Sequence, residues 1–202
     1  MIIKKYESRE EWLAGRIGCI TGTKFKDILV KRGTGKKVGF FQLIADKLGI
    51  PADDENPMAR GTRLEKEAIE EFVKQTGKKV NTDLVIFARE DNPDIAYSPD
   101  GYTDDMTESI EVKCLSSARH IETLLSQKIP DEYTEQSLQP FIVNDRLQTL
   151  YFILYDPRLL AKPFFYLTLH RESVAKEVEE YIDYQKNVLA EVEKIVLELS
   201  NF

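Results

Sequence analysis

The chain has 202 residues, 42% of them hydrophobic and 31% charged, and a formal net charge of −7. This length suits one domain with a sizeable core, and the composition is ordinary for a soluble globular protein. No apolar run is long enough for a membrane span, and residues 1–12 lack the apolar core of a signal peptide. Cys19 and Cys114 have no metal-ligand spacing. We therefore expect free thiols, a reducing cytoplasm and no membrane partner.

The charge is distributed unevenly. Residues 1–50 carry 11 Lys and Arg against 5 Asp and Glu, a balance of +6, which leaves −13 for the other 152 residues. A basic first quarter on an acidic body indicates that one face meets phosphate groups while the rest stays in solvent.

The first 30 residues predict two short helices. Ser8 and Glu11 have the spacing of a capping box, so a first helix should run through Trp12. Glycines then interrupt the chain, and Thr21 or Thr23 is placed to cap a helix from 24 to about 31. A helix N-terminus and the nearby Arg16 favour phosphate binding, although an Arg–carboxylate pair and an ordinary cap fit equally well.

Residues 31–57 predict a helix between two loops. The first loop, 31–37, is basic but lacks the glycine spacing of a nucleotide-binding P-loop. A helix should cover 38–48, followed by an acidic loop at 51–57. The next helix should open at Gly61 and Thr62 and stop at Gly77. Near its start lies Glu65, which suits the helix dipole and could also reach a metal ion.

A turn and a strand follow the predicted strand segments 84–88 and 95–97. Asp100 lies in the turn, and Glu111 and Lys113 lie in a strand over 109–114. Alternation along a strand places Glu111 and Lys113 on one side and Val112 on the buried side. The short connection at 102–109 allows an antiparallel hairpin, which would bring Asp100 to Glu111.

Two carboxylates at one place repel each other unless a cation offsets them. Mg²⁺ prefers oxygen ligands and keeps water molecules for chemistry, and an adjacent lysine can orient such a water. The set Asp100, Glu111 and Lys113 therefore suits hydrolysis of a phosphodiester. A surface hairpin with a salt bridge is the alternative interpretation.

The last third predicts helices over 117–126 and 130–143, with Pro140 bringing a kink or an early end. Strands at 150–155 and 164–170 should pair and be buried on both sides. A long helix at about 173–199 should pack along the sheet. His120 and His170 are expected in surface and strand-end roles. Strands and helices together predict a single α/β domain over 1–202.

Six short motifs follow one another along the chain: Arg16 to Thr23, Gly61 to Glu65, Ser98 to Gly101, Glu111 to Cys114, Tyr133 to Gln136, and Tyr155 to Arg158. In this order they resemble the phage lambda exonuclease (YqaJ-type) branch of the PD-(D/E)xK nucleases. The resemblance runs from about Trp12 to His170. Two positions depart from the family pattern, Thr23 in place of Ser and Leu138 in place of a second Gln.

The resemblance implies a PD-(D/E)xK restriction-endonuclease-like fold, a mixed central sheet flanked by helices, and a role for each motif. Mg²⁺, or Mn²⁺ in its place, would be held by two carboxylates and a carbonyl, and a third carboxylate, that of Glu65, would help hold a second ion or its waters. Lys113 would position the attacking water, and Gln136 would steady the site. A pocket for the 5′-phosphate would be formed by Arg16, Thr23 and Ser98. The implied metal ligands are Asp100, Glu111, Glu65 and the Val112 carbonyl.

The same resemblance implies an enzyme that digests one strand of linear double-stranded DNA from 5′ to 3′ and leaves 3′ tails for recombination by strand annealing. It implies a ring-shaped homotrimer, a single-strand annealing partner and a bacterial host cytoplasm. A restriction or repair endonuclease with the same core remains an alternative. So does an inactive module that binds DNA ends.

Overall fold

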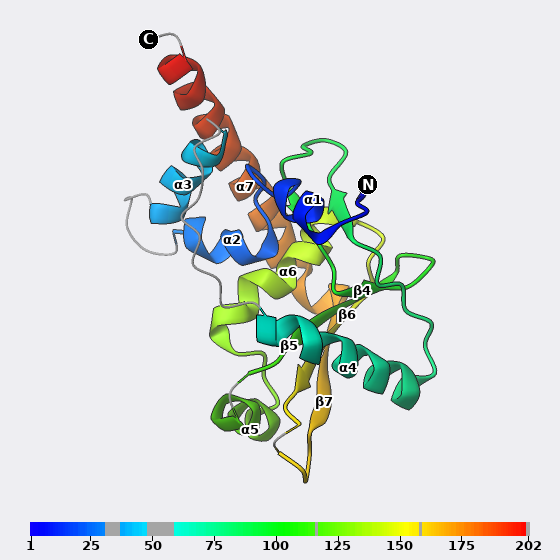
Figure 1. The fold of residues 1–202 in the computed structure, drawn as a ribbon. Coiled ribbons are helices and arrows are strands. Elements are labelled where there is room, and N and C mark those ends of the chain that lie inside the picture. Colours follow the sequence, from blue (N-terminus) through cyan, green and yellow to red (C-terminus); the bar gives the residue numbers. More distant parts are fainter. Residues whose placement is uncertain (31–36, 48–58, 116, 158, 201–202) are drawn as a thin grey trace.

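The computed structural model describes residues 1–30, 37–47, 59–115, 117–157 and 159–200. Seven strands form two sheets within these residues (Figure 1). The smaller sheet joins β1 (Ile2–Lys5), β2 (Val85–Ala88) and β3 (Ala96–Tyr97), and all its pairs are antiparallel. The larger sheet has the order β4-β5-β6-β7, with bounds Gly101–Tyr102, Glu108–Lys113, Thr149–Tyr155 and Phe164–His170. Here β5 and β6 are parallel and the other pairs antiparallel, so the predicted mixed sheet is confirmed.

The helices fall close to the predicted ranges. They are α1 (Arg9–Ala14), α2 (Gly22–Ile28), α3 (Val38–Lys47), α4 (Ala59–Thr76), α5 (Ser117–Ser126), α6 (Thr134–Val143) and α7 (Arg171–Ser200). A 3₁₀ turn over Asp131–Tyr133 precedes α6. The α1 cap is as expected, because Ser8 Oγ accepts the Glu11 N–H at 3.2 Å. None of the described helices combines the length and apolarity that crossing a bilayer requires.

Strand β5 lies at the centre of the fold, between two helices. Val112 and Ile110 point to α4, where they join the buried cluster of Ala68, Ile69 and Phe72. Glu111 and Lys113 point the other way, toward Gln136 of α6 and Tyr133 in the turn before it. The alternation along β5 therefore separates an apolar face from a chemical one, as the sequence predicts.

Helix α6 continues to Val143 despite Pro140, so an early end at the proline is wrong. Proline has no N–H to donate to the Gln136 carbonyl. Helix α2 packs on this stretch, and a Cβ at Gly22 would lie 3.1 Å from the Gln136 carbonyl oxygen. A residue without a side chain at position 22 lets the two helices approach this closely.

Three other expectations need correction. Strand β7 is not buried on both sides, because Tyr166, Thr168 and His170 are exposed and only its first residues are covered. Helix α7 packs mainly on α6 and α3, and its contact with the larger sheet is chiefly with β7. His120 is fully buried, with Nε2 3.0 Å from the Lys162 carbonyl and its ring against Phe165. The predicted loops at 31–37 and 51–57 lie almost entirely outside the described residues.

Candidate active site

The hairpin of β4 and β5 brings Asp100 beside Glu111, as predicted. Gly101 pairs with Ile110, and the Asp100 N–H continues the ladder to the Ile110 carbonyl at 3.2 Å. The Asp100 carboxylate accepts the Val112 N–H at 2.7 Å. Because a strand residue directs its N–H and C=O to the same side, the Val112 carbonyl faces this edge too, beyond the last pair of β4.

Glu111 receives two hydrogen bonds on one carboxylate oxygen. Lys113 Nζ donates to Oε1 at 2.5 Å, and the Gln136 amide donates to the same atom. The Glu111 residue is only 7% exposed. Lys113 Nζ also lies 5.1 Å from the centre of the Tyr133 ring, a contact that favours an ammonium. The predicted association of Glu111, Lys113 and Gln136 is therefore present in the structure.

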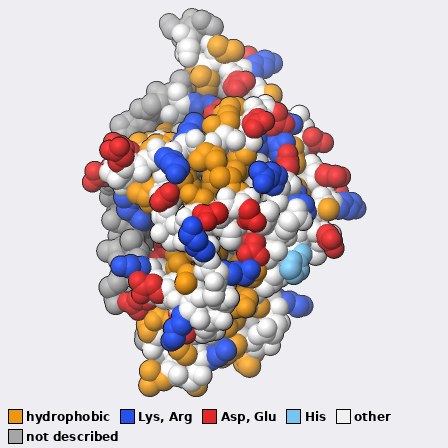
Figure 2. All heavy atoms as spheres, turned by 90° about the vertical axis from the view of Figure 1, so that its right-hand side faces the viewer, with side chains coloured by type: hydrophobic (Ala, Val, Ile, Leu, Met, Phe, Trp, Pro, Cys, Tyr) orange, Lys and Arg blue, Asp and Glu red, His pale blue; other side chains and the backbone are white. Residues whose placement is uncertain are grey.

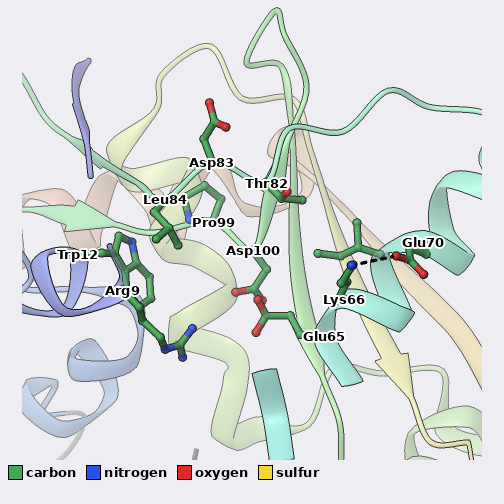
Figure 3. Close-up of a pocket in the computed structure, with 11 residues that line it drawn as sticks. Arg9, Trp12, Glu65, Lys66, Glu70, Thr82, Asp83, Leu84, Pro99 and Asp100 are labelled. Atoms are coloured by element: carbon green, nitrogen blue, oxygen red, sulfur yellow. Dashed lines mark ion pairs between the residues drawn. The ribbon is translucent and has the colours of Figure 1, made fainter. Parts of the chain in front are cut away.

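Glu65 completes the group from the first half of α4. Its carboxylate lies beside that of Asp100 in the close-up view (Figure 3). Burial raises the pKa of Asp100 well above its usual range, and the Glu111 and Glu65 carboxylates raise it further. Burial also raises the pKa of Glu65; the Arg9 cation opposes this shift and Glu111 adds to it. The three carboxylates therefore lie close enough to repel one another when they are ionised.

Lys113 stays positively charged within this group. Burial lowers the pKa of its ammonium, but the Glu111 and Asp100 carboxylates outweigh burial and leave the pKa raised. Lys113 can therefore donate hydrogen bonds and cannot act as a base near neutral pH.

The donor set fits a hard divalent cation. Three carboxylates and a backbone carbonyl are the oxygen ligands that Mg²⁺ prefers, and a cation would relieve the repulsion that raises the pKa of Asp100. Within the described residues, no three acidic, His or Cys side chains already stand as ligands to one ion. The facing oxygens of Asp100 and Glu111 instead accept the hydrogen bonds given above.

The residues predicted to bind a 5′-phosphate lie on two segments that run side by side. Ile20 forms a bridge with Ile95, which places the Arg16–Thr23 segment along the chain that leads to Ser98. Arg16 interacts electrostatically with Glu111 and Asp100, and its guanidinium lies 4.5 Å from the centre of the Trp12 ring.

Two polar side chains of these segments lack a hydrogen-bond partner among the described residues, and a third is exposed. The Arg16 guanidinium has no hydrogen bond or ion pair with any described residue, whereas its backbone N–H donates to the Leu13 carbonyl. The buried Ser98 hydroxyl has no hydrogen-bond partner among them either. Thr23 is exposed in the first turn of α2, whose N-cap is Thr21. No contact in the structure joins Thr23 to Arg16 or Ser98 directly.

A cleft of about 430 Å³ opens beside Asp100 and Glu65 (Figure 3). Its other walls include Arg9 and Trp12 of α1, neither of which was predicted to be a site residue. The spacing of Arg9 and Trp12, three positions apart on a helix, places them on one face and could have drawn attention to them. Gln139, a buried residue described below, was missed as well.

Comparisons with known proteins identify the family. Residues 11–146 match the model of the YqaJ-like viral recombinase domain. The structure is similar to an alkaline exonuclease, LHK-Exo, from Laribacter hongkongensis, with 28% sequence identity, a TM-score of 0.80 and coverage of 95% of this chain and 96% of that chain. LHK-Exo in complex with dAMP matches with 27% identity, a TM-score of 0.77 and coverage of 95% and 98%.

A phage-related exonuclease from Haemophilus somnus is similar in fold, with 12% identity, a TM-score of 0.58 and coverage of 90% of this chain and 96% of that chain. No curated protein matches the chain significantly.

Proposed function

Because the chain belongs to the YqaJ-like viral recombinase domain family, we propose that it is a Mg²⁺-dependent exonuclease. It would digest the 5′ strand of linear duplex DNA and leave 3′ single-stranded tails. The observation that carries this proposal is the convergence of Asp100, Glu111 and Lys113 with Glu65 and Gln136. The similarity to LHK-Exo, an alkaline exonuclease with a dAMP complex, supports it.

Each residue of the group has a chemical task in this proposal. Asp100, Glu111, Glu65 and the Val112 carbonyl would hold Mg²⁺, which supplies charge neutralisation and a more acidic bound water. Lys113 would orient the attacking water by donating to it, since its ammonium is retained at neutral pH. Gln136 would fix the Glu111 carboxylate through the amide hydrogen bond already present.

The 5′ end would be recognised by its phosphate. Arg16 is held by the Trp12 ring, and its N–H groups are unpaired among the described residues, which suits a doubly charged phosphate. The Ser98 hydroxyl, which has no partner, could donate to a phosphate oxygen, and Thr23 would contribute from α2. Such a pocket would place the first phosphodiester bond beside Asp100 and Glu111.

The proposal includes a ring of three subunits around the DNA and a single-strand annealing protein as partner. Its support is the recombinase family and the basic balance of residues 1–50. Part of that positive balance is offset by the rest of the chain, because Lys47 pairs with Asp94. The face in Figure 2 shows acidic and basic side chains interspersed among its described residues.

The test compares two substrates, a linear duplex labelled at its ends and a covalently closed circular duplex. Each is incubated with the protein once with Mg²⁺ and once with EDTA. Loss of nucleotides from linear DNA alone, only with Mg²⁺ and from the 5′ end, is the expected result. Cutting of the circle would favour a restriction or repair endonuclease. Binding of the protein to DNA ends without any cleavage would favour an inactive module that binds DNA ends.

A further inference from the structure

The Arg9 guanidinium forms no ion pair with the residues that the structure describes, although it lies on an aromatic ring and feels the charge of Glu65. It begins α1, and its guanidinium lies 5.5 Å from the centre of the Trp12 ring. Trp12 is itself fixed, because its Nε1 donates to the Val85 carbonyl at 3.1 Å. Arg9 makes no hydrogen bond or ion pair with any described residue. An aromatic platform therefore holds the guanidinium in place while leaving its donors for a ligand.

The cleft that Arg9 lines has the size of a nucleotide site and combines an apolar wall with both acidic and basic side chains. Its volume is about 430 Å³, within the range of small-ligand pockets. Trp12, Leu84 and Pro99 form an apolar part of the wall. Among the described lining residues, the other cation is Lys66, which faces Glu70 at 3.8 Å (Figure 3). Of the two cations that line the cleft, Arg9 is therefore the one without an ion pair to a described residue.

Arg9 and Arg16 both contact the Trp12 ring, but they interact with different carboxylates. Arg16 interacts electrostatically with Glu111 and Asp100, whereas Arg9 interacts with Glu65. The two guanidinium groups also repel each other electrostatically. Two close guanidinium groups that form no hydrogen bond or ion pair with a described residue attract polyanions more strongly than single anions, because successive phosphates can each meet one of them.

We propose that Arg9 and the cleft beside Asp100 and Glu65 bind a second phosphate group of the DNA strand, separate from the 5′-phosphate assigned to Arg16. The ligand class is a deoxynucleotide unit, with its sugar or base against the apolar wall and its phosphate on Arg9. This inference rests on the proposed function.

A different role for Arg9 would be to offset the charge of Glu65 and nothing more. The two roles separate experimentally, because a phosphate-binding Arg9 changes DNA affinity while a Glu65 partner changes the Mg²⁺ requirement. The matched control is Arg119→Ala, since Arg119 is an exposed arginine on α5 that pairs with Glu122 and Glu132.

The experiment measures binding of a fluorescent 5′-phosphorylated duplex by anisotropy over a range of salt concentrations, with EDTA present, and then KM, kcat and the Mg²⁺ midpoint. For Arg9→Ala we expect about tenfold weaker binding and a salt slope reduced by about 0.7 to 0.9, with Arg9→Lys keeping most of the slope. KM should rise more than kcat falls, and the Mg²⁺ midpoint should stay unchanged.

Unchanged affinity with a shifted Mg²⁺ midpoint would overturn the second phosphate site and leave the nuclease proposal intact. A loss equal to that of Arg119→Ala would overturn it as well. If the wild-type protein binds duplex ends without cleaving them, the nuclease proposal is wrong. The Arg9 phosphate site would still be tested by the DNA affinity and the salt slope of Arg9→Ala.

Discussion

The side-chain amides of Gln139 and Gln185 hydrogen-bond to each other in both directions, at 3.1 and 2.7 Å, and neither residue has exposed surface. Gln139 also donates to the carbonyls of Ile20 and Ala96, at 3.0 and 3.2 Å. Ile20 belongs to the segment that carries Arg16, and Ala96 lies two residues before Ser98. One buried amide therefore joins α6, α7 and both segments of the proposed phosphate pocket.

Replacement of Gln139 should destabilise the protein more than replacement of Gln185. Gln139→Leu leaves the buried Ala96 carbonyl and the Gln185 amide without a partner, while the Ile20 carbonyl keeps the Ala96 N–H at 3.1 Å. Gln185→Leu leaves only the Gln139 side-chain oxygen without its donor, because the Gln139 N–H groups keep the two carbonyls. At roughly 1 to 3 kcal/mol for each unsatisfied group, we expect a loss of about 2 to 4 kcal/mol for Gln139→Leu. Urea unfolding compares the two variants, and an equal loss in both would contradict the assigned contacts.

This buried pair shows where sequence reasoning stops. In the sequence, Gln185 is a polar residue within the apolar stripe of the last helix. Its hydrogen-bond partner Gln139 lies 46 residues away in the chain, so the sequence does not show that Gln185 is buried and paired. The same applies to His120, whose burial depends on the carbonyl of Lys162 and the ring of Phe165. A buried polar residue is recognisable only when the group that satisfies it is known.

The geometry of the candidate active site was predictable in part because it is local. Asp100, Glu111 and Lys113 lie on one hairpin, and alternation along β5 decides which side chains converge. Gln136 and Glu65 arrive from separate helices, and only the family resemblance linked them to the hairpin. The cleft of Arg9 and Trp12 depends on how α1 packs against β2 and α4, which no local pattern encodes.

Lys113→Ala should slow cleavage by roughly a thousandfold, about 4 kcal/mol, at saturating Mg²⁺. The ammonium is the group proposed to orient the attacking water, and it bonds Glu111 at 2.5 Å. Single-turnover rates measure the loss, and circular dichroism confirms the fold. Lys176→Ala, in an exposed pair on α7, is the control and should cleave normally. A Lys113→Ala rate within tenfold of wild type would rule out the assigned role.

A 5′-phosphate should accelerate digestion about ten- to a hundredfold over a 5′-hydroxyl. Charge-assisted hydrogen bonds of about 1.5–3 kcal/mol give this range. Arg16→Ala should abolish the preference, and Ser98→Ala should reduce it, because its buried hydroxyl has no other partner among the described residues. Initial rates on the two duplexes measure the ratio. Equal rates in the wild type would show that the pocket does not recognise phosphate.

The metal-free protein should lose stability as pH rises. Burial and the neighbouring carboxylates raise the pKa of Asp100, so the folded state holds a proton that the unfolded chain releases at lower pH. The contribution of this proton to the free energy of unfolding is complete below the pKa of Asp100 in the unfolded chain, about 3.9. It is lost as the pH rises through the higher pKa of Asp100 in the folded protein. Glu65 acts in the same direction.

Urea unfolding in EDTA at about pH 5 and about pH 8 tests this sign. Asp100→Asn should be the more stable protein at the higher pH and should show a smaller decrease between the two. Mg²⁺ should recover stability in the wild type and not in Asp100→Asn. An identical pH slope in both proteins would mean that Asp100 does not carry the effect.

The proposed ring gives a prediction about salt. If three subunits enclose the duplex, loading depends on counterion release and should fall steeply with ionic strength, whereas continued digestion of an encircled duplex should not. A single subunit that dissociates after each cut would be equally sensitive in both phases. The measurement is product length after loaded enzyme is challenged with salt and unlabelled competitor DNA. Long products after the challenge, and a mass three times that of the 23.3 kDa chain in light scattering, are expected. Products of a few nucleotides, or a monomer mass at micromolar concentration, would exclude the ring while leaving the chemistry of Asp100 and Glu111 untouched.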